Sequence, residues 1–140
     1  MVFKKEYYFR TNGNFDIVNI TDHVIKAVNE AGMREGMILI FSPSSTSAIT
    51  TTEYENGCIA DLREWFESVI PEGKDYAHNA RWGDGNGPSH LRASILGASF
   101  TCPINEGQIV LGTWQQIIFV DFDNKPRNRK LIFQFVGDST

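Results

Sequence analysis

The sequence has little cysteine, no long apolar run and no excess of positive charge, and each shortage excludes a class of protein. Cys58 and Cys102 are too few for a thiolate zinc site or a disulfide scaffold. The longest aliphatic or aromatic run, at 37–41, is far below the roughly 20 residues that span a bilayer. We therefore expect two inert buried thiols, no membrane partner and, without a secretory signal pattern, a cytoplasmic protein.

Basic residues are outnumbered, with 13 Lys and Arg against 17 Asp and Glu and a net charge of −4. Nucleic-acid binding relies on many basic groups that neutralise phosphates, so nucleic acid is not an expected partner. Aromatic residues make up 12% and hydrophobic residues 41% of the 140 residues, which is enough for a core and excludes disorder. The absence of linkers and repeats predicts a single domain over residues 1–140.

The pattern of apolar and turn residues predicts a compact antiparallel α+β fold with seven or eight strands and about three helices. The expected strands are 2–11, 15–19, 37–41, 48–55, 99–104, 108–111, 114–121 and 129–136. One expected helix follows Thr21, a second carries an apolar stripe to about Ile70, and a third runs from Pro88 to Gly97. Residues 72–88 form the longest polar stretch and are expected to be a functional or mobile loop.

One histidine lies within this loop, and a second follows it. His78 and His90 are too far apart in sequence for a helical zinc motif, but they can still meet in space. Imidazoles suit zinc binding or acid–base chemistry near neutral pH, and surface histidines are the alternative. Asn79 and Asn86 lie between them among aromatic side chains, which is typical of a pocket wall.

Three further groups are candidates for a polar site. Glu53 and Glu55 would share one strand face, as a pocket base and a structural acid or as an exposed polar face. The serine-rich turn at 42–47 could hold an anion. Arg127 and Arg129 could clamp a phosphate or carboxylate, or could be protective charges at a sheet edge. No phosphate-binding loop with Gly-Lys-Ser/Thr and no nucleophile elbow is present.

Five segments together resemble the YjbQ-like family, whose members are often called secondary thiamine-phosphate synthases. They are TSAITTTEYE at 46–55, YAHN at 76–79, PSH at 88–90 followed by Ser94 and Gly97, LGTWQQI at 111–117, and the pair Arg127 and Arg129. They occur in family order over about 41–137. Ser45 stands where many members have His, the run at 53–55 replaces Asn-Glu-Asn, and Asn79 replaces Asp, which mark a subfamily.

The resemblance implies an α+β homotrimer with a polar pocket near or between subunits. Catalytic roles would fall to His78, His90, Glu53 and Gln115. Substrate-binding roles would fall to Ser45, Thr46, Ser47, Asn79, Asn86, Trp114, Arg127 and Arg129. A divalent metal, zinc or magnesium, is a possible cofactor, with His78 and His90 as the ligands, and no organic cofactor is implied.

Three functions remain open from the sequence. The first is an enzyme that joins a pyrimidine diphosphate to a thiazole phosphate, with its phosphate on the arginines and the serine-rich turn. The second is a metal-dependent hydrolase or lyase that uses His78, His90 and Glu53. The third is a non-enzymatic binder of a small phosphorylated molecule. The expected partner is a small phosphorylated compound, and a homotrimer is expected.

Overall fold

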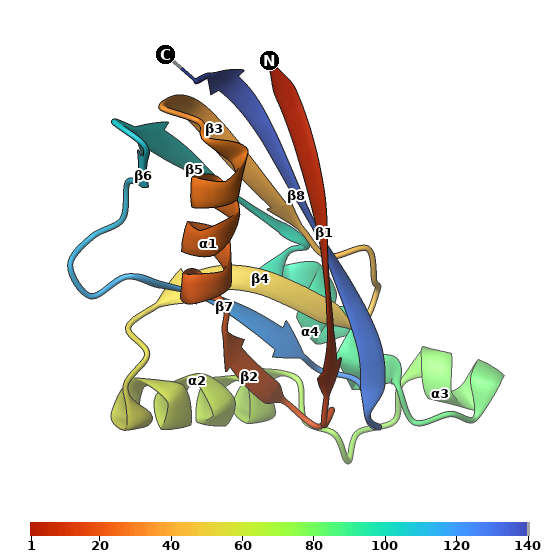
Figure 1. Ribbon diagram of the computed structural model, residues 1–140. Helices are drawn as coiled ribbons and strands as arrows, with labels where there is room; N and C mark the ends of the chain where they lie inside the picture. Colours follow the sequence, from red (N-terminus) through yellow and green to blue (C-terminus); the bar gives the residue numbers. More distant parts are fainter. Residues whose placement is uncertain (140) are drawn as a thin grey trace.

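The computed structural model describes residues 1–139 and arranges them as two antiparallel sheets with four helices (Figure 1). The larger sheet has the order β1-β8-β3-β5-β6, with strands Val2–Thr11, Arg127–Asp138, Glu35–Phe41, Ser99–Asn105 and Gln108–Ile109. The smaller sheet has the order β2-β7-β4, with strands Asp16–Asn19, Gln116–Asp121 and Ser47–Thr52. The predicted antiparallel α+β fold is confirmed.

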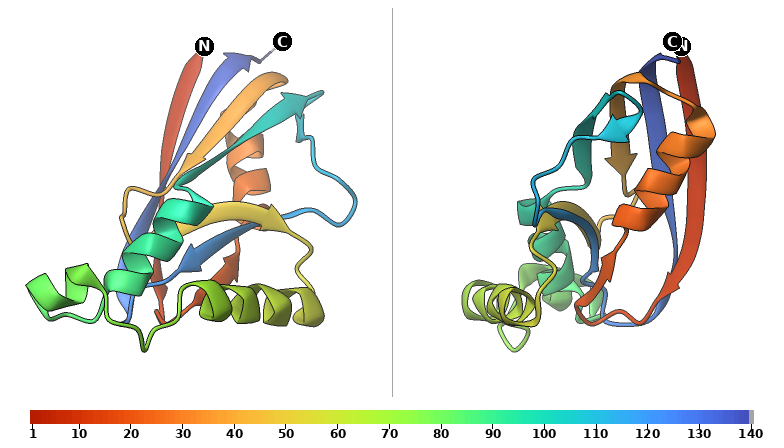
Figure 2. Two further views of the ribbon diagram at one scale, coloured as in Figure 1. Left: turned by 180° about the vertical axis from the view of Figure 1, so that it is seen from behind. Right: turned by 60° about the vertical axis from the view of Figure 1, so that its left-hand side comes forward.

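The smaller sheet lies between two cores, which explains why β7 is so apolar. Ile117 and Phe119 point into a core shared with α1 (Thr21–Ala31) and the larger sheet. Ile118 and Val120 point into a second core, covered by α2 (Asn56–Val69) and α4 (Gly87–Leu96). Figure 2 shows this layering, with α1 along the larger sheet and α2 beyond the smaller one.

The structure has one helix more than the three expected. This helix, α3 (Ala77–Trp82), lies within the stretch 72–88 that was expected to be a loop. None of its residues is buried, so no apolar periodicity marks it in the sequence. Local contacts define it instead. Gly83 ends it in a left-handed conformation with φ of 67°, and the Asn79 side chain accepts a hydrogen bond from the Gly87 N–H at 2.7 Å.

The strand expected to reach Glu55 ends earlier, because β4 stops at Thr52. Glu55 instead begins α2, where its carboxylate accepts hydrogen bonds from the N–H groups of Cys58 and Gly57 at 2.8 and 2.7 Å. These two bonds lower the pKa of Glu55. Glu53 and Glu55 therefore do not share a strand face.

The two cysteines are unpaired and differ in environment. Cys102 is fully buried in the first core, and burial raises the pKa of its thiol, whereas Cys58 is half-buried. The expectation of two buried thiols holds for Cys102 alone. No helix within residues 1–139 is both long and apolar enough to cross a membrane.

Candidate functional site

The ladder between β4 and β7 divides the predicted site residues into two groups. Ser47 pairs with Asp121 at one end of this ladder, and Thr52 pairs with Gln116 at the other. At about 3.3 Å per residue, the five steps from Ser47 to Thr52 separate the ends of β4 by roughly 17 Å. The histidines and arginines lie near the first end, whereas Glu53, Trp114 and Gln115 lie near the second.

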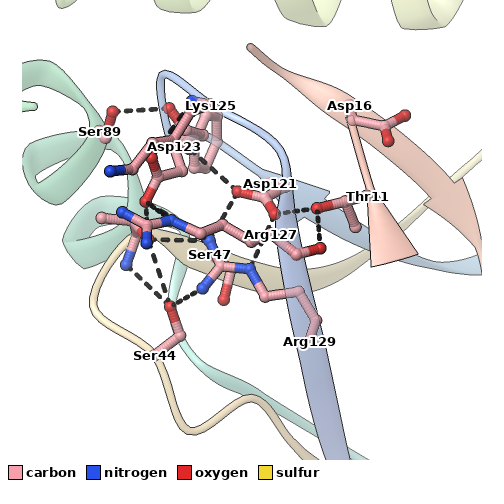
Figure 3. A network of polar contacts seen from close by, with 12 residues as sticks. Thr11, Asp16, Ser44, Ser47, Ser89, Asp121, Asp123, Lys125, Arg127 and Arg129 are labelled. Atoms are coloured by element: carbon pink, nitrogen blue, oxygen red, sulfur yellow. Dashed lines mark hydrogen bonds and ion pairs between the residues drawn. The ribbon is translucent and has the colours of Figure 1, made fainter. Parts of the chain in front are cut away.

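A buried network of acids and arginines occupies the first end (Figure 3). Asp121 has no exposed surface, and its two oxygens accept hydrogen bonds from Nε and Nη2 of Arg129 at 2.8 and 2.7 Å. Thr11 Oγ1 donates to the same carboxylate at 2.5 Å. This bidentate ion pair therefore joins the ends of β1 and β7 to the start of β8.

Asp123 is the second buried acid of the network, with an exposed fraction of 2%. Its Oδ2 accepts from Arg127 Nε at 3.0 Å and from Thr46 Oγ1 at 3.1 Å, and its Oδ1 accepts from Asn86 Nδ2 at 3.3 Å. Burial favours the neutral acid, but these donors outweigh it and hold the pKa of Asp123 below its ordinary value. The carboxylate is therefore ionised at neutral pH and connects three separate segments.

The two arginines have different roles. Arg129 also donates to Ser44 Oγ at 2.8 Å and to Thr46 Oγ1 at 2.9 Å, and its side chain is 10% exposed. The Arg127 side chain is 39% exposed, and within residues 1–139 its terminal Nη groups make no hydrogen bond. Arg129 thus braces the loop between β3 and β4, while the terminal guanidinium edge of Arg127 stays unbonded among the described residues.

The structure brings the two histidines together, as the sequence allowed. Their ring centroids are 4.5 Å apart, with His78 on α3 and His90 on α4. His90 Nδ1 lies 3.2 Å from the Ser45 carbonyl oxygen. His78 Nδ1 is buried 3.4 Å from Asp84 Oδ1, within ion-pair distance but without hydrogen-bond geometry. Because both Nδ1 atoms face protein oxygens, both Nε2 atoms remain for a ligand or a proton.

Most polar groups of the predicted anion-binding turn, residues 42–47, bond to other parts of the protein. Thr46 is buried and donates to Asp123, and the Ser45 carbonyl faces His90. Ser47 is 1% exposed, with its hydroxyl 2.7 Å from that of Ser42. Ser45 is therefore the exposed serine of the turn beside the histidine.

The two predicted asparagines also position other groups. Asn79 Oδ1 accepts from the N–H of Gly87 and so connects α3 to α4. Asn86 is buried, donates to Asp123 and accepts from Ser89 Oγ at 2.7 Å. Their amides hold the chain around the site.

An open depression of about 480 Å³ lies over this network. Its size falls in the range of small-molecule sites, roughly 300–1,000 Å³. Its floor comes from the loop before β4, from the start of α4 and from the turn between β7 and β8. The lining residues are Pro43, Ser44, Ser45, Thr46, Asp84, Asn86, His90, Asp123, Arg127, Asn128 and Arg129.

The other end of the ladder carries a separate pocket of about 470 Å³, lined in part by Glu53, Tyr54 and Trp114. Trp114 is 73% exposed, and β7 begins at Gln116 rather than at Trp114 as expected. Gln115 holds the preceding loop, because its amide donates to Thr51 Oγ1 and accepts from the Gly112 N–H, both at 2.9 Å. One chain does not bring these residues to the histidines.

Sequence reasoning missed the two buried acids, Asp121 and Asp123, and the contact of Asp84 with His78. The sequence does contain a signal for Asp121 and Asp123. Two acids with one residue between them precede a turn, and two arginines with the same spacing follow it. Opposite charges on the two sides of one turn predict ion pairs, and the structure forms them although β7 and β8 lie in different sheets and do not pair.

The residues present do not by themselves form a resident metal site. Within residues 1–139, no three His, Cys, Asp or Glu side chains are grouped closely enough to hold a metal ion. His78 and His90 could supply two nitrogens, whereas zinc sites in proteins use three or four protein ligands. Their role as metal ligands stays a prediction.

Comparison with known proteins identifies the family. The model of the family described as "UPF0047 protein YjbQ-like" matches residues 5–138. A UPF0047 protein of Archaeoglobus fulgidus is 38% identical over 127 residues, which cover 91% of this chain and 96% of the relative. One from Methanothermobacter thermautotrophicus is 38% identical over 136 residues, covering 97% and 93%.

Solved structures agree over nearly the whole chain. A Sulfolobus solfataricus protein, described as YbjQ-like and of unknown function, has a TM-score of 0.93 at 33% identity and 99% coverage of both chains. An uncharacterised Clostridium acetobutylicum member has a TM-score of 0.86 at 34% identity, covering 94% of this chain and 99% of that one. The chain therefore belongs to the YjbQ-like UPF0047 family, a family of uncharacterised proteins.

Proposed function

We propose that the chain binds a small phosphorylated molecule in the depression over the acid–arginine network. The observation that carries this proposal is the state of Arg127. Asp123 fixes its Nε, and its terminal N–H groups remain available at the depression. A planar guanidinium fork matches the spacing of phosphate oxygens, so this edge can bind one bidentately.

The reaction we propose is the one that the family resemblance implies. The nitrogen of a thiazole phosphate attacks the methylene carbon of a pyrimidine-methyl diphosphate. A C–N bond forms, the C–O bond breaks, and diphosphate leaves with the bonding electrons. Such a step mainly needs the leaving group to be bound and positioned, which suits Arg127, with a proton from His78 or His90.

We further propose that the chain acts as a homotrimer. The predicted roles of Glu53 and Gln115 beside the histidines require a second copy, because the length of β4, roughly 17 Å, keeps the two groups apart in one chain. The outward face of the larger sheet also exposes apolar side chains, among them Val2, Met37 and Val136. Association would cover them.

The test combines binding and turnover on the purified protein. Inorganic diphosphate binding is measured by calorimetry, and the two thiamine precursors are incubated with Mg²⁺. Arg127→Ala is expected to weaken diphosphate binding about tenfold or more, because it removes the free fork. The exposed Arg34, at the start of β3, supplies the matched control Arg34→Ala, which should bind as the parent does.

The outcomes separate the candidate functions. Turnover that survives both His78→Ala and His90→Ala contradicts their assigned role. Diphosphate binding without turnover supports the non-enzymatic binder, and unchanged binding in Arg127→Ala contradicts the phosphate site. Stoichiometric zinc by elemental analysis, lost in His78→Ala, would favour a metal-dependent hydrolase or lyase instead.

A further inference from the structure

A second depression borders the first one and shares part of its wall. It has a volume of about 420 Å³ and lies against the outer side of α4. Ser44, Ser45 and His90 line both depressions. The second depression is completed by Ser47, Ala93, Ser94, Gly97 and Ala98. His90 therefore stands at the boundary between two adjoining spaces.

The two spaces differ in chemistry. The first is lined by charged side chains, including Asp84, Asp123 and Arg127. The second has no ionisable lining residue apart from the shared His90, and its other side chains end at a methyl, a hydroxyl or a hydrogen. A charged compartment and an uncharged compartment thus meet at one imidazole.

The uncharged compartment is a fixed part of the fold. The Gly97 carbonyl accepts from the Ile49 N–H at 3.0 Å, and the Ala98 carbonyl accepts from the Ser42 N–H at 2.8 Å. Gly97 has φ of 99°, a conformation that side-chain-bearing residues rarely adopt, so this position stays without a side chain. Ser94 Oγ donates to the His90 carbonyl at 2.8 Å and is thereby directed along its own helix.

We infer that the ligand of this site is a phosphate ester with an uncharged organic group. The phosphate binds at Arg127, the organic group occupies the depression beside Ala93 and Ala98, and the ester oxygen lies next to His90. This inference rests on the proposed function and defines its substrate class. A volume of about 420 Å³ is ample for one planar ring, and inorganic phosphate alone would leave it empty.

Two esters of equal charge test the inference, methyl phosphate and phenyl phosphate. The parent protein is expected to bind phenyl phosphate about tenfold more tightly, since its ring is removed from water. Ser94→Phe places a ring in the depression and should abolish this preference. Ile95, on the same helix, is 58% exposed and does not line the depression, so Ile95→Phe is the matched control and should keep the preference.

The methyl NMR signals of Ala93 and Ala98 provide a second readout. Phenyl phosphate should shift them in the parent protein, whereas methyl phosphate should leave them in place. Arg127→Ala should weaken both esters by a similar factor and keep their ratio. Equal affinity for the two esters, or a preference that survives Ser94→Phe, would overturn the inference while the phosphate site stands. If neither ester binds the parent protein, the proposed function fails as well.

Discussion

Asp123 holds three segments in place, since it accepts hydrogen bonds from Thr46, Asn86 and Arg127. Asp123→Asn removes the charge at nearly constant volume and leaves Arg127 without its ion pair. Loss of charged hydrogen bonds of this kind costs about 2–3 kcal/mol of unfolding free energy at pH 7. Urea unfolding monitored by Trp fluorescence measures this loss of unfolding free energy. Asp61→Asn, at an exposed position of α2, should stay within about 0.5 kcal/mol of the parent.

The same residue gives a pH dependence with a defined sign. The pKa of Asp123 is lowered in the folded chain, so its stabilisation is present above the unfolded pKa of about 3.8 and is lost as pH falls through the folded value. The stability difference between the parent and Asp123→Asn should therefore shrink below about pH 4. A difference that stays constant from pH 7 to pH 2 would show that the charge of Asp123 contributes nothing.

At the residue scale, sequence reasoning finds the exposed polar groups better than the buried ones. His78, His90 and Arg127 were candidates from sequence because imidazoles and guanidiniums near a polar loop suit a binding site, and their roles stay predictions. The acids that position them were not found, because Asp123 looks like an ordinary turn residue until burial and its donors are known. Burial depends on packing between sheets, which local patterns do not encode.

The ladder between β3 and β8 contains a facing glycine pair, Gly36 and Gly137, with φ of 155° and 157°. A Cβ on Gly36 would lie 2.2 Å from the Val136 carbonyl oxygen. Gly36→Ala should therefore lower the unfolding free energy by about 3 kcal/mol, from steric overlap and backbone strain together. Gly73→Ala is the control, since its Cβ would meet no atom within 4 Å and should be neutral or slightly stabilising. Equal stability of the two variants would contradict this account.

At the element scale, most strands were predicted from sequence, and Pro88 and Gly97 predicted the limits of α4 to within one residue. The apolar residues expected to face the core from α4, Leu91 and Ile95, are exposed instead. The sheet order was not predicted, because it depends on contacts between distant segments. The turn at Gly13 looks like a hairpin signal, yet β1 pairs with β8 and β2 pairs with β7. This turn carries the chain from one sheet to the other.

At the scale of the whole molecule, the outward face of the larger sheet exposes a row of apolar side chains. Val2, Val136 and Met37 lie in register across three neighbouring strands and are each at least half exposed. If this face forms the proposed trimer, light scattering should give three times the chain mass of 15.8 kDa. Met37→Lys should yield monomers, because a charge would be buried. Ile25→Lys, on α1, changes another exposed apolar position and should stay trimeric.

The contacts that build the proposed phosphate site join segments far apart in the chain. Thr11 and Asp121 are 110 residues apart, and Arg129 reaches Thr46 across 83 residues. A site assembled from such distant segments forms only when both sheets have docked, so loss of binding and loss of the fold should coincide on heating. Any ligand of Arg127 then raises the melting temperature of the whole chain by mass action. A thermal-shift screen of phosphate esters therefore tests the proposed site through the stability of the whole chain.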